Sequence, residues 1–293
     1  MKNNVCKPIY EFLMWDNCNN NCKFCFQRKS PRNFTIEKQS FICDSVVKFI
    51  KSNQYTPNNH VLIVGGEIFD NIKRYEFLYD FFDELTNMMV SRHIDLLYLN
   101  TNLLYNETCF TMLKSILELF LEKNVIDRLK FTTSYDLEGR FKTQKAKELF
   151  LRNLNELTNI PSLHTVTNLI LTKNVCEAIL EDKFNIFNFQ EKNHTQINMI
   201  PYIIFDQSLT APRDMIFNCL RKIDEENPEF IKQFLFELDM KQPRILLQST
   251  PNGEFIEKTC MNSGCGHSIN FKKYSSSNSC FVCDIKTIFN KYE

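Results

Sequence analysis

The chain is poor in glycine and carries no net charge, and both absences exclude classes of protein. Only 6 of its 293 residues are glycine, about 2% where an ordinary chain has about 7%. Neither a G-x-x-x-x-G-K-[ST] phosphate loop nor a G-x-G-x-x-G dinucleotide motif occurs, which excludes nucleotide chemistry built on either loop. Thirty-five basic residues balance 35 acidic ones. We therefore expect no bulk electrostatic binding of nucleic acid.

The sequence also lacks a long apolar run, and this sets the expected compartment. No stretch of about 18 apolar residues appears, and the N-terminal segment lacks the apolar core of a secretory signal. We therefore expect a cytoplasmic protein without a membrane span, in which thiols stay reduced. The 12 cysteines then favour metal or redox chemistry over a disulfide framework.

Seven of the cysteines fall into two groups, Cys18, Cys22 and Cys25 near the start and Cys260, Cys265, Cys280 and Cys283 near the end. The other five have apolar neighbours and are predicted to be small core residues; they are Cys6, Cys43, Cys109, Cys176 and Cys219.

Between the two cysteine groups, short apolar runs alternate with amphipathic segments. The strand-like runs are Tyr10–Met14, Val61–Val64, Leu96–Leu99, Leu129–Thr133, Thr165–Leu171 and Ile197–Ile204. Helical periodicity lies between them, and the predicted helices are one capped by Thr35, then Tyr75–Met89, Cys109–Leu121, Phe141–Leu157 and a shorter one after Asn174. This repetition predicts βα units and a parallel sheet. Six strands suit an open barrel or a doubly wound sheet, and either gathers ligands at the carboxyl ends of its strands.

The pattern changes after Ile204 and divides the chain into three predicted parts. Residues 1–205 form the α/β core, and 206–244 form a mostly helical connection with a break at Pro228. Residues 245–293 form a small C-terminal extension with four cysteines, which begins with a strand at Ile245–Gln248 and a turn at Pro251-Asn252-Gly253.

The first cysteine group has a spacing that suits an iron-sulfur cluster. Cys18, Cys22 and Cys25 lie in the loop after the first predicted strand. Three thiolates can hold one face of a cubane cluster and leave its fourth iron without a protein ligand. An open iron can coordinate a small molecule, by the logic that keeps a catalytic zinc unsaturated. The alternative is a three-cysteine zinc site completed by a distant histidine, although no histidine lies within 30 residues of the group.

The segment CNNNCKFC at 18–25 resembles the C-x3-C-x2-C signature of radical S-adenosylmethionine (radical SAM) enzymes. The resemblance continues in order through about the first 205 residues. Gly65-Gly66-Glu67 is similar to the family's GGE, which binds the amino group of the methionine moiety. Asn100-Thr101-Asn102 lies where relatives often carry Thr-Asn-Gly, and Ser134-Tyr135-Asp136 lies where Ser-x-Asp is common near the ribose. Two further segments match on the fifth and sixth predicted strands: Thr167-Asn168, and Asn198 to Tyr202, similar to an I-P-Y segment near adenine.

The resemblance implies an open partial (β/α)6 TIM-like barrel and a radical mechanism. A reduced [4Fe-4S] cluster on Cys18, Cys22 and Cys25 would cleave S-adenosylmethionine to a 5′-deoxyadenosyl radical that abstracts hydrogen from a substrate. An electron donor such as flavodoxin or ferredoxin would be a partner. The residues that the resemblance assigns to S-adenosylmethionine are Gly65, Gly66, Glu67, Thr101, Ser134, Asp136, Asn168 and Pro201.

The second cysteine group allows two interpretations. Cys260-x4-Cys265-x14-Cys280-x2-Cys283 is compatible with a structural zinc ribbon, in which His267 could replace one thiolate. It also resembles the twitch or SPASM-type extensions of radical SAM enzymes, which implies a second, auxiliary [4Fe-4S] cluster. Such relatives often modify peptides, so a peptide or protein is the first expectation for the substrate. A nucleotide, carbohydrate or other small molecule is the alternative, and a non-catalytic zinc-binding module is a third.

Three residues near these motifs carry weaker expectations. Tyr135 and Arg140 flank the Ser-x-Asp segment and could face the substrate, whereas Trp15, the one tryptophan, is expected to pack before the cysteine loop. Gly139 lies just beyond the same strand end, and the sequence suggests no role for it.

Overall fold

Parallel strands follow one another across a single sheet in nearly the order of the chain. The computed structural model describes residues 8–25, 33–52, 54–200, 207–239, 244–250, 252, 254–259, 289 and 291. The strands are β1 (Ile9–Leu13), β2 (Asn59–Val64), β3 (Ile94–Asn100), β4 (Leu129–Tyr135), β5 (His164–Ile170), β6 (Gln196–Ile200), β7 (Arg244–Ser249) and β8 (Phe255–Thr259). Their order is β6-β5-β4-β3-β2-β1-β7-β8. The sequential order from β1 to β6 is that of a barrel opened at one side, and it excludes the doubly wound alternative.

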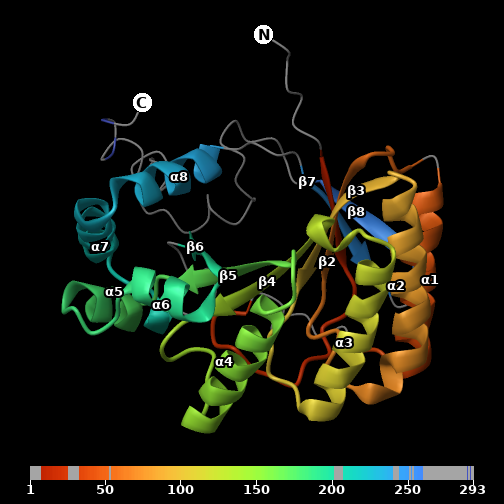
Figure 1. Ribbon diagram of the computed structural model, residues 1–293, viewed down its shortest axis with the longest axis horizontal. Coiled ribbons are helices and arrows are strands. Elements are labelled where there is room, and N and C mark those ends of the chain that lie inside the picture. The colour runs from red at the N-terminus through yellow and green to blue at the C-terminus, as the bar shows by residue number, and fades with distance from the viewer. Residues whose placement is uncertain are drawn as a thin grey trace.

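Most of the helices form an outer layer on one face of this sheet, and the last two extend beyond its β6 edge (Figure 1). They are α1 (Ile36–Lys51), α2 (Tyr75–Val90), α3 (Glu107–Glu122), α4 (Gln144–Thr158), α5 (Lys173–Leu180), α6 (Ile186–Asn193), α7 (Arg213–Glu226) and α8 (Pro228–Asp239). Thr35 caps α1 as predicted, because its hydroxyl accepts from the N–H of Lys38 at 3.4 Å. The predicted start of α4 at Phe141 is wrong: Thr143 caps the helix, which begins at Gln144. Pro228 starts α8, where a missing N–H costs nothing.

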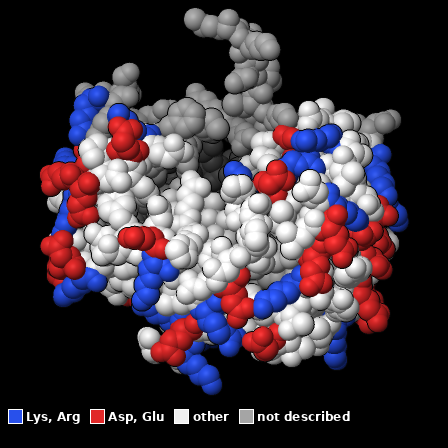
Figure 2. Space-filling model, in the orientation of Figure 1, with Lys and Arg blue, Asp and Glu red and all other residues white. Residues whose placement is uncertain are grey.

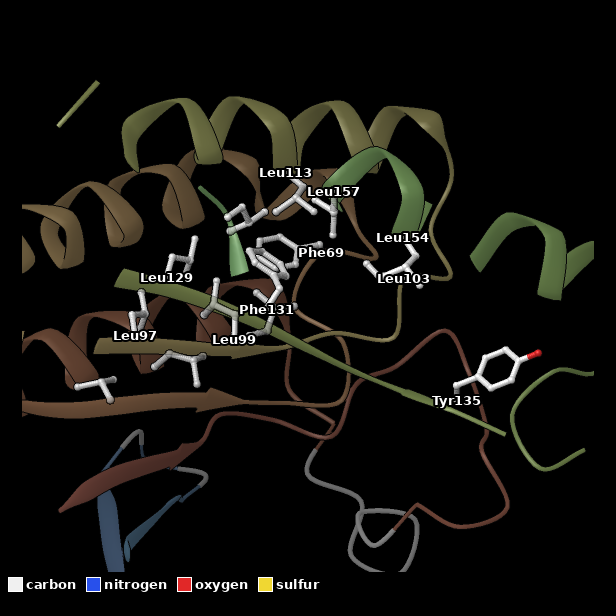
Figure 3. Packing of buried hydrophobic residues seen from close by; sticks show 14 of the residues in the cluster. Phe69, Leu97, Leu99, Leu103, Leu113, Leu129, Phe131, Tyr135, Leu154 and Leu157 are labelled. Carbon is white, nitrogen blue, oxygen red and sulfur yellow. The ribbon is translucent and has the colours of Figure 1, made fainter. Parts of the chain in front are cut away.

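The core lies between the sheet and the helices. β4 shows why: residues at alternate positions from Leu129 to Tyr135 are buried against the helices, and the others are half-buried on the opposite face. Phe69, from the loop after β2, lies between Phe131 of β4 and Leu113 of α3 (Figure 3). Its ring centroid is 6.4 Å from that of Phe131 and 5.8 Å from that of Phe82. The loop that carries the Gly-Gly-Glu segment is therefore fixed by the core.

The sheet continues past the predicted core. β7 pairs in parallel with β1, from Ile9 opposite Arg244 to Leu13 opposite Gln248, and β8 pairs antiparallel with β7. The sequence predicted the strand at Ile245–Gln248 but not β8. Asn252 lies in a turn between the two strands, as predicted, and its neighbours Pro251 and Gly253 lie outside the described residues. The hairpin thus covers the β1 edge of the sheet and leads directly to the first C-terminal cysteine.

Two further findings concern the cysteines and helices that the structure describes. Cys43, Cys109, Cys176 and Cys219 are buried free cysteines, which confirms the prediction that they are core residues. Among the helices described, none has the length and apolar character needed to span a membrane.

Candidate active site

The three N-terminal cysteines lie in the loop that follows β1, at the carboxyl edge of the sheet. Met14 and Trp15 leave the strand fully buried, and the chain then turns outward, so that Cys18 is exposed and Cys22 and Cys25 are half-buried. None of the three takes part in a disulfide within the described residues. The N–H of Cys25 donates to the carbonyl of Cys22 at 3.1 Å, which forms a tight turn between the last two. We call residues 14–25 the cysteine loop.

The Gly-Gly-Glu segment after β2 holds the start of the cysteine loop through its backbone. The N–H of Gly66 donates to the carbonyl of Trp15 at 2.7 Å, and that of Glu67 donates to Asn17 at 2.8 Å. A Cβ atom on Gly66 would lie 2.1 Å from the carbonyl oxygen of Asn17, whereas one on Gly65 would meet nothing closer than 3.5 Å. Gly66 must therefore lack a side chain so that the backbone at Asn17 can lie against it.

Glu67 is a buried carboxylate that is surrounded by protein donors. The N–H groups of Ile68 and Phe69 donate to Oε1 at 3.0 and 3.1 Å, and the Thr101 hydroxyl lies 3.0 Å from both oxygens. The N–H of Asn102 donates to Oε2 at 2.5 Å. Burial raises the pKa of Glu67 to about 7, although these hydrogen bonds act in the opposite direction. The side chain thus ties the loop after β2 to the loop after β3.

A buried arginine that the sequence analysis missed organises the same region. Arg74 donates through Nε to Gln39 at 2.6 Å and through Nη1 to the carbonyl of Glu67 at 2.7 Å, and it forms an ion pair with Asp70. Its guanidinium lies 5.4 Å from the ring centroid of Trp15. Asp70 in turn accepts from the backbone N–H of Asn19, in the cysteine loop, at 2.7 Å. Trp15 has the packing role expected of it, and no local sequence pattern marks Arg74 as its partner.

The loop after β4 supports the other side of the cysteine loop. The N–H of Lys23 donates to the carbonyl of Gly139 at 2.9 Å, and the Asn20 amide donates to the carbonyl of Arg140 at 3.2 Å. A Cβ on Gly139 would lie 3.0 Å from the ring of Phe24 and 2.8 Å from the Asp136 carboxylate. Gly139 therefore has a role that the sequence did not suggest: it lets the cysteine loop lie directly against this turn.

Asp136 and Arg140 are both buried beside the cysteines. Asp136 accepts from the N–H groups of Glu138 and Gly139, and its other oxygen is buried without a hydrogen-bond partner. Burial raises its pKa. Arg140 is 4% exposed and donates to the carbonyl of Asn102 at 2.6 Å. The unsatisfied oxygen of Asp136 is a site that an added donor would fill.

Two side-chain amides point at cysteine sulfurs. Asn102 Nδ2 lies 3.4 Å from Cys18 Sγ, and Asn20 Nδ2 lies 3.2 Å from Cys22 Sγ. The backbone N–H of Asn20 adds a contact of 3.4 Å to Cys18 Sγ. Donors of this kind favour the thiolate over the thiol.

The surroundings of two of these thiols favour the protonated form. Although Cys18 is exposed as a residue, the chain around its sulfur removes solvent, and together with the nearby charge of Glu67 this raises the pKa of Cys18 to about 12. Burial also raises the pKa of Cys22, against the lowering effect of Arg140. Metal binding would thus release protons from these groups.

The three cysteines are candidate ligands for a cluster or for a single ion. Within the described ranges, no three His, Cys, Asp or Glu side chains converge as ligands of one metal ion. A cubane binds each thiolate through a different iron, so its cysteines lie further apart than the ligands of one zinc. The three cysteines share one loop and have amide donors at two of their sulfurs, an arrangement compatible with such a cluster.

The remaining predicted residues lie on the half-buried face of the sheet or in its core. Ser134 and Asn168 are register partners on β4 and β5, and the Asn198 amide donates to Asn168 at 3.2 Å. Thr101, Glu67 and Asp136 are buried, and hydrogen bonds connect the first two. Pro201, Cys260, Cys265, Cys280 and Cys283 lie outside the described residues.

Tyr135 does not face a substrate. It points to the helix side of the sheet, is 2% exposed and packs against Phe189 with ring centroids 4.5 Å apart (Figure 3). Alternation along β4 explains this, because Ser134 and Tyr135 must face opposite sides. Arg140 is likewise buried, with its guanidinium 5.3 Å from the Phe150 ring centroid.

Charge is unevenly distributed over the face seen in Figure 2. Acidic and basic side chains gather over the outer helices, and the hollowed middle of this face is mostly free of both. The hollow does not present a strong charge of one sign on this face.

One solved structure resembles the whole described fold. Native anSMEcpe with bound AdoMet and Cp18Cys peptide, an anaerobic sulfatase-maturating radical SAM enzyme, matches with a TM-score of 0.53 and 12% identity over 97% of this chain and 96% of that one. The chain has the fold of the radical SAM enzymes. Streptococcus suis SuiB bound to precursor peptide SuiA also matches, with a TM-score of 0.49 and 14% identity over 94% of this chain and 63% of that one. No family model and no curated protein matches the sequence.

This fold is an open, mostly parallel α/β sheet with an outer layer of helices, as predicted. The loops that follow β1, β2, β3 and β4 meet at the carboxyl edge of these strands. Here those loops are the cysteine loop, the Gly-Gly-Glu segment, the Thr-Asn segment and the Ser-x-Asp turn. Residues 120 positions apart, such as Asn20 and Arg140, are in contact there.

Proposed function

We propose that the protein is a radical SAM enzyme whose cluster is held by Cys18, Cys22 and Cys25. The observation that carries this proposal is the direct contact of the cysteine loop with all three neighbouring strand-end loops. Gly66 and Glu67 bond its first part, Asn102 bonds Asn19 and Cys18, and Gly139 bonds Lys23. A triad of cysteines alone would be weak evidence, but four motifs joined by hydrogen bonds in this fold support one shared site.

When bound, the cluster supplies the electron that cleaves S-adenosylmethionine to the 5′-deoxyadenosyl radical, which takes hydrogen from the substrate. The chain's own residues would bind S-adenosylmethionine and orient it. Gly65, Gly66 and Glu67 would bind the amino group of the methionine part through the main chain and the charge of Glu67, whose oxygens already accept from protein donors. Asp136 has a buried oxygen available for a hydroxyl donor of the ribose.

Other residues complete the proposed cofactor site. Ser134 and Asn168 would contact the nucleoside from the half-buried face of the sheet, and Pro201 would lie near the adenine. Thr101 acts differently, because its hydroxyl is bonded to Glu67 in the described structure and its backbone N–H donates to Thr132 at 3.0 Å. We assign Thr101 to ordering this site rather than to direct contact.

A peptide or protein is the substrate class that we propose. The similar structure of anSMEcpe contains a peptide together with AdoMet, and its alignment spans nearly the full length of both chains. The described chain reaches Thr259 at the end of β8, next to β7 and β1 in the sheet, and the C-terminal cysteines follow it in the sequence. A nucleotide or carbohydrate substrate remains the competing proposal within the same chemistry. An external donor such as flavodoxin or ferredoxin would supply the electron.

We propose that Cys260, Cys265, Cys280 and Cys283 hold a second [4Fe-4S] cluster, with zinc as the competing occupant. Anaerobic reconstitution with iron and sulfide separates these outcomes. About eight irons per chain supports two cubanes, and about four irons with one zinc supports a zinc ribbon. The Cys280→Ala variant should lose only the C-terminal metal.

The radical SAM proposal itself is tested by the electron paramagnetic resonance of the reduced cluster. We expect S-adenosylmethionine to change this signal, because a cluster held by three cysteines would leave one iron open to it. The Cys280→Ala variant is the matched control and should show the same change. A cluster whose signal is insensitive to S-adenosylmethionine would contradict the proposal, as would zinc in place of iron at the first site.

A further inference from the structure

We infer that Asn20 and Asn102 set the reduction potential of the N-terminal cluster by donating hydrogen bonds to the sulfurs of Cys22 and Cys18. The inference rests on the proposed function and concerns residues to which neither the motif nor the resemblance assigns a role. The two contacts measure 3.2 Å and 3.4 Å, within range for an N–H donor to sulfur.

The orientation of the Asn102 amide is fixed by its other partners. Its Oδ1 accepts from the backbone N–H of Leu104 at 2.7 Å, and a backbone N–H can only donate. Nδ2 must therefore be the atom that faces Cys18, and it also donates to Asn19 Oδ1 at 2.7 Å. Asn102 is 7% exposed, so water competes little for these bonds.

The Asn20 amide is fixed by the same reasoning. Its Oδ1 accepts from the backbone N–H of Asn21 at 2.9 Å, and its Nδ2 lies 3.2 Å from the carbonyl of Arg140. A carbonyl can only accept, so Nδ2 is the donor on that side. The remaining N–H is available to Cys22. Each amide thus connects a sulfur to a loop from a different strand.

The direction of the effect follows from charge. Reduction adds negative charge to the cluster and its thiolates, and an N–H donor stabilises the more negative state. Each amide should therefore raise the reduction potential. Removing one donor should shift the ratio of reduced to oxidised cluster about tenfold at a fixed potential, which for one electron is about 59 mV.

The experiment is a redox titration of reconstituted protein that follows the visible spectrum. The variants are Asn102→Leu, Asn102→Asp, Asn20→Leu and Asn20→Asp. The Asp forms keep the acceptor that bonds Leu104 or Asn21, so they remove the donor with less risk to the loop. Asn17→Leu is the control: Asn17 lies in the same loop, and its side chain bonds the backbone of Phe34 at 2.8 and 3.2 Å instead of a sulfur.

We expect a more negative midpoint potential in the Asn102 and Asn20 variants that hold the cluster, and an unchanged potential in Asn17→Leu. The inference is overturned if their potentials equal that of the parent protein, or if Asn17→Leu shifts as far. Loss of the cluster from all four variants, with retention in Asn17→Leu, would assign the amides to cluster retention and overturn the tuning role. Failure of the proposed function is distinct, because the parent protein would then take up no four-iron cluster.

Discussion

Gly66 shows at the scale of a single residue how the cysteine loop is held. A methyl group there would lie 2.1 Å from the carbonyl oxygen of Asn17, so the backbone of one of the two loops must move. At Gly65 the closest atom to an added Cβ is 3.5 Å away, which is ordinary contact. Neighbouring glycines of one motif therefore differ in what they require.

We expect Gly66→Ala to lower the free energy of unfolding by about 1–3 kcal/mol or more, as overpacking does, and Gly65→Ala to change it little. Chemical denaturation of the two variants measures the difference. Equal stability of the two would show that the close approach at Gly66 is not a constraint.

At the same scale, the titration of Glu67 makes the free energy of unfolding depend on pH. Its pKa of about 7 lies above the ordinary 4.5, so the folded protein holds this proton more tightly than the unfolded chain does. The stabilising effect of protonation is complete below pH 4.5 and is lost as the pH rises through about 7, by about 3 kcal/mol.

In Glu67→Gln that part of the pH dependence should disappear, although the overall stability should be lower because an amide group would face N–H donors. Denaturation curves of the metal-free protein between pH 4.5 and 8 measure the slope. If parent and variant lose stability in parallel over this window, Glu67 is not the group that titrates.

At the scale of elements, the segment that leads into α2, from Asp70 to the short 3-10 helix Ile72–Arg74, holds the cysteine loop through a buried ion pair. Arg74 and Asp70 are 4% and 7% exposed at their side chains, and Asp70 accepts from the N–H of Asn19. Removing one member of a buried pair leaves the other charge uncompensated, which costs about 3–5 kcal/mol. An exposed pair such as Lys51 with Glu84 contributes no more than about 1 kcal/mol.

We therefore expect Arg74→Met to destabilise the fold strongly and to increase amide hydrogen exchange in residues 15–19, which lose their support. Lys51→Met is the matched control, since it removes a cation that pairs α1 with α2 at the surface. Similar unfolding free energies for the two variants would contradict the role given to Arg74.

The same scale shows what sequence patterns can and cannot provide. Strands β1 to β7 and the cap at Thr35 were predictable, because each depends on a local run of apolar residues or on one capping side chain. β8 was not predictable, since its place depends on pairing with β7, which in turn pairs with β1 more than 230 residues earlier. Arg74 and the contact of Asn102 with Cys18 were not predicted for the same reason: the partners are distant in the chain.

At the scale of the whole molecule, the open sheet explains why residues from four loops meet. Parallel strands in sequential order deliver each successive loop to the same edge, so motifs about 30 residues apart become neighbours. The sequence predicted that ligands gather at this edge, and the structure brings the strand-end motifs together there, while their roles in binding a cofactor stay predictions. It did not predict that Gly66 and Gly139 serve contacts between loops, because the space around a glycine depends on the folded chain.

The central claim is that the loops at the carboxyl edge of the sheet form a site for radical chemistry on S-adenosylmethionine. The most direct measurement is the release of 5′-deoxyadenosine by anaerobically reconstituted protein after addition of dithionite and S-adenosylmethionine. We predict release from the parent protein and from Cys280→Ala, and none from Cys22→Ala. The absence of release from protein that holds a reduced four-iron cluster, or equal release from Cys22→Ala, would contradict the account.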